Sequence, residues 1–372
     1  MDTSLQERLR RLGLEAGLDR VGFAAALPFE DVHAEMQHRA SEGLNAELKF
    51  TYKDPASATD IRRTFPWARS LVVGIRSYLP DAGFSMRQPG RARIARFAIE
   101  DPYRPLGEAL DVMASELRAQ GSRAEVLADD DRLVDRAAAV RAGVAWWGKS
   151  TMAITPGLGP WFVIGSVATD AELQPDAPMK RDCGTCDACL PACPTGALVA
   201  PGVLDARKCL AAISQTGGVM PREWREAMRD RLYGCDDCLD ACPPGQRLSI
   251  RSTRARGNVD LRWIMTAADR TLLDRFGHFY LPGRSPRILR RNALVAIGND
   301  RDPSLFDVAA FHVGHPDWLL RAHAVWALSR FEDPRVRPVL EAQQEHETHP
   351  AVIEELTLAV GSGAIPQPAN GA

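Results

Sequence analysis

The sequence contains no apolar run of the roughly 18 residues that a membrane-spanning helix needs. Its first twenty residues are charged throughout, lack the apolar core of a secretory signal, and predict an amphipathic helix. The chain of 372 residues is 45% hydrophobic and 25% charged, with a formal net charge of −2, a composition typical of a soluble globular protein with two or three domains. We therefore expect a cytoplasmic protein without membrane attachment.

Cysteine is missing from most of the chain, because all eight cysteines lie between residues 183 and 242. The cytoplasm keeps thiols reduced, which disfavours disulfides and favours a metal site or a catalytic role. Residues 183–198 read CGTCDACLPACPTGAL, a Cys-x2-Cys-x2-Cys-x3-Cys-Pro spacing. In bacterial ferredoxins this spacing gives three thiolates to one [4Fe–4S] cluster and the fourth to its neighbour. A second group is therefore expected downstream.

The second group is present but is one cysteine short, because Leu232 stands where its first thiol would be. Cys209, between the two groups, completes a set of eight. Zinc also suits paired Cys-x2-Cys units, but it does not explain the triple spacing followed by x3-Cys-Pro. The simplest assignment gives Cys183, Cys186, Cys189 and Cys242 to one [4Fe–4S] cluster and Cys193, Cys209, Cys235 and Cys238 to the other.

Strand and helix patterns change along the chain and indicate an α+β multidomain fold. Apolar runs at 20–27, 68–79 and 123–128 predict strands that alternate with helices. After about residue 255 the strand pattern disappears and helical periodicity continues to about 361. The predicted parts are an α/β domain (1–170), a ferredoxin-like two-cluster domain (171–250), a HEAT-like helical domain (251–362) and a disordered tail (363–372).

The helical part contains an internal repeat. RILRRNALVAIGNDRDP, starting at Arg287, superposes on LLRAHAVWALSRFEDP with a shift of 31 residues, so that Ala293 matches Ala324 and Ala296 matches Ala327. Small residues on one face allow helix pairs to stack closely, which favours a short HEAT-like array. HPAVIEELTLAVG resembles a weak third copy. The alternative is that two amphipathic helices are similar by chance.

Charge is uneven along the chain. Between Arg247 and Arg291 there are eleven arginines and only three acids, about +8 in a chain of −2. This asymmetry favours a polyanionic partner whose phosphates arginine forks would bind, and we expect a nucleic acid. The alternative is a basic face that keeps the domain soluble.

Several nucleotide and cofactor motifs are absent. No Gly-x-Gly-x-x-Gly follows a predicted strand, and the Asp-x-His-x-x-Gly loop that gives cobalamin a histidine ligand is missing. GVAWWGKS, residues 143–150, fits the P-loop pattern to the letter. It follows a predicted helix and precedes two predicted strands, and its two tryptophans are poorly suited to wrapping phosphate. We therefore reject a P-loop here.

Three acids, Asp129, Asp130 and Asp131, lie between a predicted strand and a predicted helix. Open α/β sheets place ligand sites at the carboxyl ends of their strands. Asp129, if buried, would have a raised pKa and could act as a proton donor. The alternative is a solvated acidic turn that caps the helix.

The order of these features resembles the epoxyqueuosine reductase family over residues 5 to 360. The cysteine set, with the lone Cys209 in DARKC, is the most specific part of the likeness, and DRAAAVRAGVAWWGKS resembles the family's stretch around Gly-Lys-Asn. The resemblance implies cobalamin, cycling between cob(II)alamin and cob(I)alamin, two [4Fe–4S] clusters in the pattern above, and reduction of epoxyqueuosine to queuosine at the tRNA wobble position. It also implies that Asp129, seven residues before Arg136, is the proton donor.

Further expectations follow from the same resemblance. The partners would be tRNA and an external electron donor, and the protein would be a monomer. The cobalamin pocket would include Asp129, Arg96, Tyr103, Lys149 and Ser150, and tRNA would bind Arg284, Arg287, Arg290 and Arg291.

The sequence departs from the family near the expected pocket. RFAIEDPYRPL carries Pro102, and has Arg104 in place of a histidine, Ser150 stands where the family commonly has Asn, and the second cysteine group ends CPPG rather than CPWN. Two alternatives stay open, a cobalamin and iron–sulfur reductase of the reductive dehalogenase type acting on a small molecule, and a non-enzymatic electron carrier.

Overall fold

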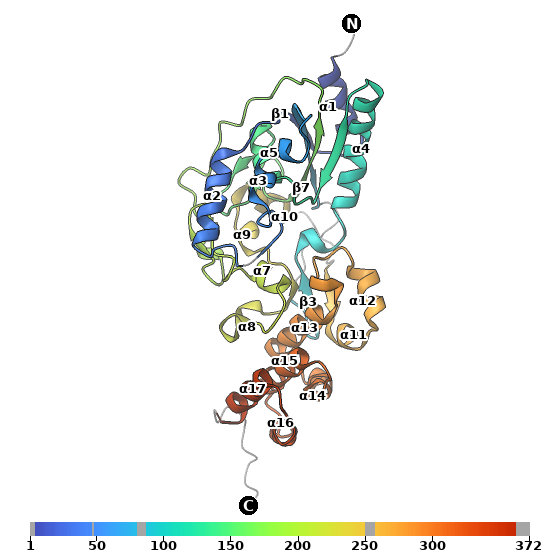
Figure 1. The fold of residues 1–372 in the computed structure, drawn as a ribbon. Helices are drawn as coiled ribbons and strands as arrows, with labels where there is room; N and C mark the ends of the chain where they lie inside the picture. The colour runs from blue at the N-terminus through green and yellow to red at the C-terminus, as the bar shows by residue number, and fades with distance from the viewer. Residues whose placement is uncertain (1–3, 47, 80–86, 250–256, 362–372) are drawn as a thin grey trace, which may run out of the picture. The chain divides into compact units, whose positions relative to one another are not determined.

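The computed structural model describes residues 4–46, 48–79, 87–249 and 257–361 (Figure 1), and the predicted tail lies outside these ranges. Contacts divide the chain into two compact units. Unit 1 comprises Met1–Phe84, Ile99–Cys209 and Asp236–Arg254, and unit 2 comprises Ser85–Ala98, Leu210–Cys235 and Ala255–Ala372. The units therefore interleave along the chain, unlike the consecutive segments predicted, and Cys235 belongs to unit 2 while Cys238 and Cys242 belong to unit 1.

Unit 1 is built on a four-stranded sheet in the order β1-β2-β7-β4. The runs predicted as strands form β1 (Arg20–Ala25), β2 (Ser70–Ser77) and β4 (Ala124–Ala128), and β7 is Phe162–Thr169. Every neighbouring pair is antiparallel. The alternation of strands and helices did not predict this, because it is typical of parallel sheets.

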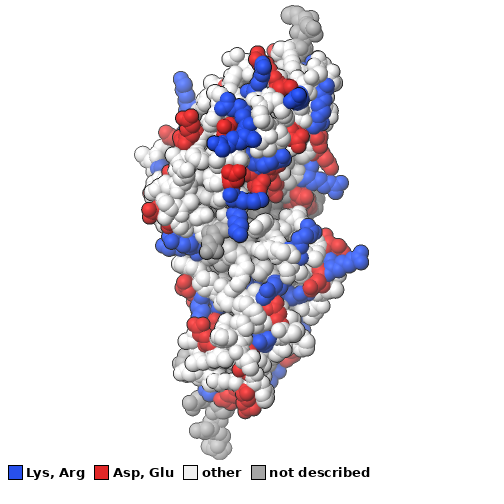
Figure 2. All heavy atoms as spheres, in the orientation of Figure 1, with Lys and Arg blue, Asp and Glu red and all other residues white. Residues whose placement is uncertain are grey.

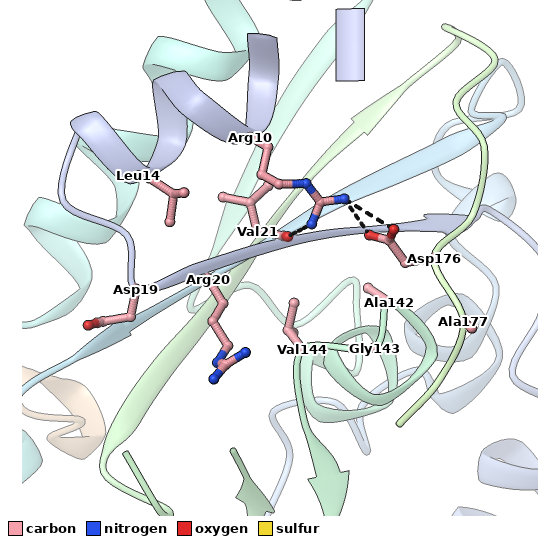
Figure 3. Close-up of a pocket in the computed structure, with 10 residues that line it drawn as sticks. All are labelled: Arg10, Leu14, Asp19, Arg20, Val21, Ala142, Gly143, Val144, Asp176 and Ala177. Atoms are coloured by element: carbon pink, nitrogen blue, oxygen red, sulfur yellow. Dashed lines mark hydrogen bonds and ion pairs between the residues drawn. The ribbon is translucent and has the colours of Figure 1, made fainter. Parts of the chain in front are cut away.

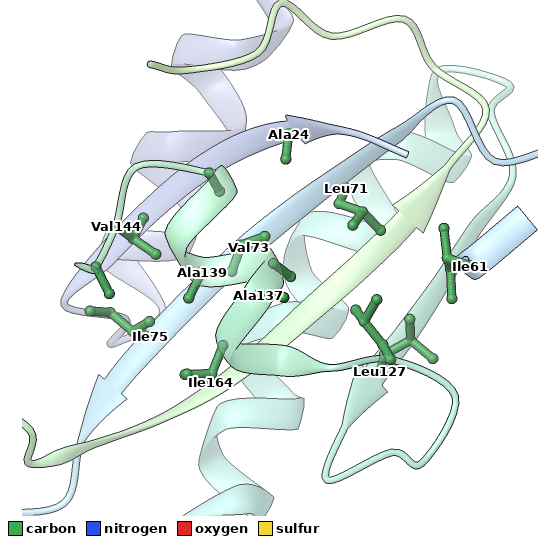
Figure 4. Packing of buried hydrophobic residues seen from close by; sticks show 14 of the residues in the cluster. Ala24, Ile61, Leu71, Val73, Ile75, Leu127, Ala137, Ala139, Val144 and Ile164 are labelled. Carbon is green, nitrogen blue, oxygen red and sulfur yellow. The ribbon is translucent and has the colours of Figure 1, made fainter. Parts of the chain in front are cut away.

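Alternate residues of the strands face opposite layers of unit 1. On one face, Leu71 and Val73 pack against the alanines of helix α5 (Asp135–Arg141), as Figure 4 shows. On the other face, Val72 packs with residues of helices α1 (Leu5–Glu15) and α4 (Tyr103–Ala119). This period of two is what a sheet buried on both faces requires. Gly22 of β1 allows α5 to approach, since a Cβ there would lie 2.2 Å from the carbonyl oxygen of Ala142.

Shorter elements of unit 1 surround this sheet and carry seven of the eight cysteines. The cysteine segments include two short helices, α6 (Cys189–Ala192) and α9 (Asp237–Asp240), which pack against each other. The remaining elements are α2 (Glu30–Ser41), α3 (Pro55–Thr59), η1 (Ile61–Arg63), β5 (Trp146–Trp147), β6 (Ala153–Ile154), β8 (Leu198–Ala200), β9 (Val203–Leu204) and α10 (Pro243–Ser249).

Unit 2 begins with a three-stranded sheet in the order β10-β3-β11, in which β10 (Arg231–Tyr233) runs parallel and β11 (Asn258–Asp260) antiparallel to β3 (Arg91–Ile94). A bidentate pair joins Arg93 of β3 to Asp230, with the closest nitrogen and oxygen 2.7 Å apart. The other elements that precede the repeat are η2 (Arg96–Ala98), α7 (Leu210–Gln215), α8 (Arg222–Met228), α11 (Leu261–Thr266), α12 (Asp269–Phe276) and η3 (Pro282–Arg284).

The predicted repeat forms the helical part of unit 2. Helix α13 (Arg287–Asp300) and helix α15 (Trp318–Leu328) pack together, and their matched alanines are completely buried. The matched Asp302 and Asp333 have the same role, because each carboxylate accepts a 2.9 Å hydrogen bond from the backbone two residues later. The array continues with η4 (Pro303–Leu305), α14 (Phe306–Val313), α16 (Val336–Gln344) and α17 (Pro350–Gly361).

No helix within the described ranges is both long and apolar enough to cross a membrane. This agrees with the absence of a long apolar run from the sequence.

Candidate functional site

Four cysteines that lie far apart in the sequence come together in unit 1. Burial, together with the charges of Cys183, Cys189 and Cys186, raises the pKa of the Cys242 thiol to about 11. Mutual repulsion of this kind requires the four thiols to lie close together. A cationic iron–sulfur cluster removes this repulsion, because metal coordination stabilises the thiolates. The group has the composition predicted for the first cluster.

The turn at Gly148–Ser150 reaches this cysteine group. The backbone N–H of Lys149 lies 3.5 Å from the sulfur of Cys183, and the Lys149 ammonium donates a 2.7 Å hydrogen bond to the carbonyl of Gly184. The same ammonium favours the thiolate of Cys189, whose pKa is nevertheless raised, mainly by burial. Lys149 therefore contacts Cys183 through its backbone and stabilises the thiolate of Cys189 through its charge.

The P-loop pattern is a structural coincidence, as the sequence indicated. Its second glycine, Gly148, begins the tight turn between β5 and β6, with its N–H bonded to the Met152 carbonyl at 2.8 Å. Its first glycine, Gly143, ends α5 with a φ of +66°, and a Cβ there would lie 2.3 Å from the Ala177 carbonyl oxygen. The element that follows directly is the strand β6 and not a helix, so the segment lacks the strand–loop–helix context of a P-loop.

Hydrogen bonds to sulfur also mark the second cysteine group. Cys193 accepts a 3.2 Å bond from the Ala197 N–H, and burial of the thiol is outweighed by donors from Thr195, Leu198 and Ala197, so that its pKa is lowered. The Thr195 hydroxyl also donates to the carbonyl of Lys208 at 2.6 Å, which ties the Cys193 loop to the residue before Cys209. These bonds prepare Cys193 to bind a metal as a thiolate.

The other two cysteines predicted for this cluster are held by different cores. Cys238 packs against Leu239 and Trp161 in unit 1. Cys235 packs against a cluster in unit 2 that includes Val295, Trp326 and Ala327.

Among the described residues, no three Cys, His, Asp or Glu side chains converge on a point where they could share one metal ion. A single tetrahedral zinc ion requires such convergence. A [4Fe–4S] cluster is bound by four thiolates around a larger inorganic core. The distinction between the two metals therefore rests on the cysteine spacing.

A pocket of about 490 Å³ opens in unit 1 beside the first cysteine group. Trp147, Gly148 and Thr151 line it, and they flank Lys149, whose backbone contacts Cys183. Most of the wall is apolar, with polar groups at a few points, as is usual for a small-molecule or cofactor site. The remaining lining includes Met36, Leu44, Leu48, Phe50, Tyr52 and Leu204.

Asp129 differs from the two acids that follow it. It stands directly after β4 with a φ of +53° and is solvent-exposed, yet surrounding protein removes enough water to raise the pKa of its carboxyl, and the charges of Asp101 and Asp130 raise it further. Asp130 instead forms a bidentate pair with Arg132, which outweighs burial and lowers the pKa of Asp130. A carboxyl with a raised pKa keeps its proton at a higher pH than an ordinary aspartate, so the protonated form is available as a general acid.

The start of α5 links Asp129 to the pocket. Burial raises the pKa of Asp135 well above its ordinary value, the charge of Asp129 contributes, and the Oδ1 atom of Asp135 has no hydrogen-bond partner among the described residues. Its neighbour Arg136 lines the pocket and donates a 2.9 Å bond to the Thr151 carbonyl. Burial lowers the pKa of Arg136, while Asp135 and Tyr103 act against this. Sequence reasoning did not propose Asp135, Arg136 or Tyr52, although the Asp-Arg pair at the start of α5 was a usable signal.

The residues predicted for cobalamin do not all lie together. Tyr103 lies near enough to Arg136 to influence its charge, and Ser150 is buried beside Lys149 in the turn. Arg96 is buried in unit 2, whereas the other four belong to unit 1.

The four predicted tRNA arginines have unequal exposure. Arg284 is exposed and forms no ion pair within the described part of the chain. Arg287 is paired with Asp317 at 2.8 Å, and Arg290 with Asp269 at 2.5 Å. Arg291 is only 1% exposed, so the prediction that it contacts tRNA is wrong: the side chain turns into unit 2 and satisfies backbone carbonyls there.

A second hollow, of about 440 Å³, lies between α1, β1 and the end of α5 (Figure 3). Arg10 crosses it to bond the Val21 carbonyl at 2.6 Å and the carboxylate of Asp176 at 3.0 Å. Its charge is therefore already neutralised. On the face drawn in Figure 2, positive and negative side chains are interspersed, so charge alone does not outline a nucleic-acid surface there.

Comparison with known proteins agrees with this organisation. Residues 182–245 match the family of 4Fe-4S double cluster binding domains, and residues 281–361 match HEAT repeats. An epoxyqueuosine reductase of Bacillus cereus is 30% identical over 354 residues, which cover 91% of this chain and 92% of the relative. That of Bacillus subtilis is 29% identical over 96% of this chain and 95% of the relative.

Among solved structures, an epoxyqueuosine reductase crystallised with an epoxyqueuosine-modified tRNA-Tyr stem loop superposes with a TM-score of 0.87. It is 29% identical, and the match covers 96% of this chain and 98% of the other. The likeness spans both units, including the two-cluster and helical parts.

Proposed function

The chain belongs to the epoxyqueuosine reductase family, and we propose that it converts epoxyqueuosine to queuosine in tRNA with Asp129 as proton donor. It is an oxidoreductase. Opening the epoxide and removing its oxygen consumes two electrons and two protons and releases one water. The protein must therefore deliver electrons singly, supply a proton at the oxygen, and hold the modified base.

The iron–sulfur part supplies the electrons. Cys183, Cys186, Cys189 and Cys242 would hold one cluster, as their mutual effect on pKa supports. Cys193, Cys209, Cys235 and Cys238 would hold the other, supported by the spacing and by the hydrogen bonds to Cys193. Two such clusters, when bound, carry single electrons.

Cobalamin is the proposed partner of the clusters, and the lining of the pocket next to the first cysteine group supports it as part of the binding site. The pocket has an apolar wall with Trp147, and Arg136 and Tyr52 provide polar contacts, which suits a large flat ring with amide arms. Lys149, Ser150 and Tyr103 would contribute from the turn and from α4. Cobalamin supplies, when bound and reduced, a strongly nucleophilic metal centre. Arg96, in unit 2, remains a prediction from the resemblance alone.

Asp129 would hold the proton for the epoxide oxygen. Its raised pKa keeps a larger fraction of the carboxyl protonated than an ordinary aspartate has at the same pH. Asp135, at the start of α5, lies near enough for the charge of Asp129 to raise its pKa, and the charges of Asp101 and Asp130 act on the Asp129 carboxyl itself. The single observation that carries the assignment is the contrast with Asp130, which Arg132 holds ionised.

tRNA is the proposed partner, and we propose that unit 2 binds it. Arg284 is free to bind phosphate, and Arg287 and Arg290 could exchange their surface carboxylates for phosphates. The external electron donor and the monomeric state stay predictions.

The test is an anaerobic conversion assay. Protein with reconstituted clusters receives cobalamin, a strong reductant and tRNA carrying epoxyqueuosine, and queuosine is detected by mass spectrometry after digestion. Conversion that needs both cobalamin and intact clusters would support the proposal.

Two control reactions separate the alternatives. Omitting cobalamin from the same reaction should abolish conversion, whereas a plain electron carrier would bind no cobalamin. No conversion with both cofactors bound would favour reduction of a small molecule, an alternative that relatives matching more than 90% of the chain do not favour.

A further inference from the structure

Arg291 is a buried arginine without an acidic partner. Its side chain is only 1% exposed, and burial, together with the charges of Arg225 and Arg287, lowers its pKa to about 9. All five of its N–H donors are used. Three of these bonds end on the backbone carbonyls of Ile213, Thr216 and Gly218, at 2.6–3.0 Å. An arginine in a surface ion pair does not need several backbone carbonyls as partners. These bonds therefore hold the backbone of residues 213–218 in place.

Asn292, the next residue of α13, completes the network. Its side-chain oxygen accepts the two remaining Arg291 bonds, at 3.0 and 2.8 Å. Its amide group donates to the carbonyls of Ser214, at 2.9 Å, and Leu232, at 2.8 Å. Asn292 is completely buried, and every hydrogen-bonding position of its side chain is occupied.

The residues that this network holds lead to Cys235. Leu232 is three residues before it, and the Gly234 N–H donates a 2.9 Å bond to the hydroxyl of Ser214. Cys235 also packs against the buried cluster that includes Val295, one turn along α13 from Arg291, and Trp326 of α15. Helix α13 thus holds the backbone at residues 213–218 and at Leu232, which are the two ends of the segment that leads into Cys235.

We propose that Arg291 and Asn292 are positioning residues for the second [4Fe–4S] cluster, acting through Cys235. The inference rests on the proposed function only in taking Cys235 as a ligand of that cluster. It gives the HEAT-like helices a role besides substrate binding, because they preset where one thiolate stands. Buried polar networks with every partner satisfied are suited to fixing one geometry.

A matched control lies two turns further along the same helix. The Asn299 amide also donates two hydrogen bonds to backbone carbonyls of unit 2, those of Arg225 and Arg229, at 2.7 and 2.9 Å. These carbonyls belong to α8 and to the turn after it, not to the cysteine loop. Asn299→Ala therefore removes the same chemistry from the same helix without reaching Cys235.

The experiment compares Asn292→Ala with Asn299→Ala in the full chain after anaerobic reconstitution. Iron and sulfide content, the electron paramagnetic resonance of the reduced clusters and their redox titration are measured without tRNA. We expect Asn292→Ala to lose one cluster, or to show one cluster with a changed signal and potential, while Asn299→Ala keeps both as in wild type. Two clusters with wild-type signals and potentials in Asn292→Ala would overturn the proposal.

Thermal unfolding separates positioning from general damage. If Asn292→Ala does not fold, Arg291→Lys takes its place, because lysine keeps the buried cation but cannot form the planar fork. The same selective change in one cluster is expected, and an unchanged pair of clusters would again contradict the proposal. The readout needs no substrate, so failure of the tRNA reaction in wild type would leave this test intact.

Discussion

The two units differ in how two of their charged groups are partnered. In unit 1, Asp129 has no cationic partner within the described structure, and the Oδ1 atom of Asp135 has no hydrogen-bond partner there. In unit 2, Glu355 is held by Arg222 and Arg225, and Arg291 has every donor occupied. Burying a polar group without a partner is costly, so Asp135 carries a cost that Glu355 and Arg291 avoid.

This difference separates a reaction site from a scaffold. Groups whose pKa is shifted by burial, and that still reach solvent or a pocket, can exchange protons. Groups that are enclosed and fully bonded hold backbone in place. Substitution of Asp129 should therefore change turnover with little cost in stability, and breaking the ion pair between Glu355 and Arg225 should do the reverse.

Removing a cluster ligand of unit 1 should have the largest effect. Cys242→Ser takes away one of the four thiolates that gather there, so we expect half of the iron to be lost and turnover to fall below detection. Iron analysis and the tRNA assay measure this. Met179→Leu is the control, because Met179 packs in the same small cluster and its replacement conserves volume. Full turnover in Cys242→Ser would show that the reaction does not need the first cluster.

Breaking the buried ion pair of unit 2 should cost stability instead. Glu355→Gln leaves Arg225, whose side chain is 0% exposed, without a negative partner. We expect the free energy of unfolding to fall by about 3 kcal/mol. Denaturant unfolding gives this value, and turnover per folded molecule should stay near wild type. A large loss of turnover at unchanged stability would show that the contrast between the units is wrong.

A smaller effect is expected from acid. The Arg321 guanidinium, 2.7 Å away, together with hydrogen bonds from the His349 N–H and the Gln343 amide, lowers the pKa of Glu347 from 4.5 to about 2. Since the folded pKa lies below the unfolded one, this stabilisation is complete above pH 4.5 and is lost as the pH falls towards 2. We expect about 2 kcal/mol from this pair. Unfolding of Glu347→Gln, followed between pH 5 and 3, should lack that part of the pH dependence; an unchanged slope would contradict it.

Much of the organisation could be predicted from the sequence because it depends on the spacing of residues within short segments. The cysteine intervals indicated two clusters, and the repeat at a shift of 31 residues indicated stacked helices whose matched alanines are indeed buried. Asp129 was singled out by its place after a strand, and the structure distinguishes it from Asp130.

What the sequence did not predict depends on long-range partners. The antiparallel order of the sheet and the interleaving of the units are decided by packing between distant segments. Arg291 sits in the most basic stretch of the chain, where a surface role is the natural expectation, and only its carbonyl partners more than seventy residues away reveal that it is buried. The pocket residues Tyr52 and Arg136 likewise meet only in the folded chain.

The most direct test of the account is the single-turnover reduction of epoxyqueuosine-tRNA by Asp129→Asn, with both clusters reduced beforehand. Positioned general acids contribute about 10²- to 10⁴-fold, so we expect a loss of that size. Stability should not fall, because asparagine tolerates the φ of +53° and carries no charge to desolvate. Asp131→Asn, the same change two residues along, should react normally. In wild type the rate should decline as the pH rises through the raised pKa of Asp129, and in Asp129→Asn this decline should vanish. Reduction by Asp129→Asn at the wild-type rate would contradict the account.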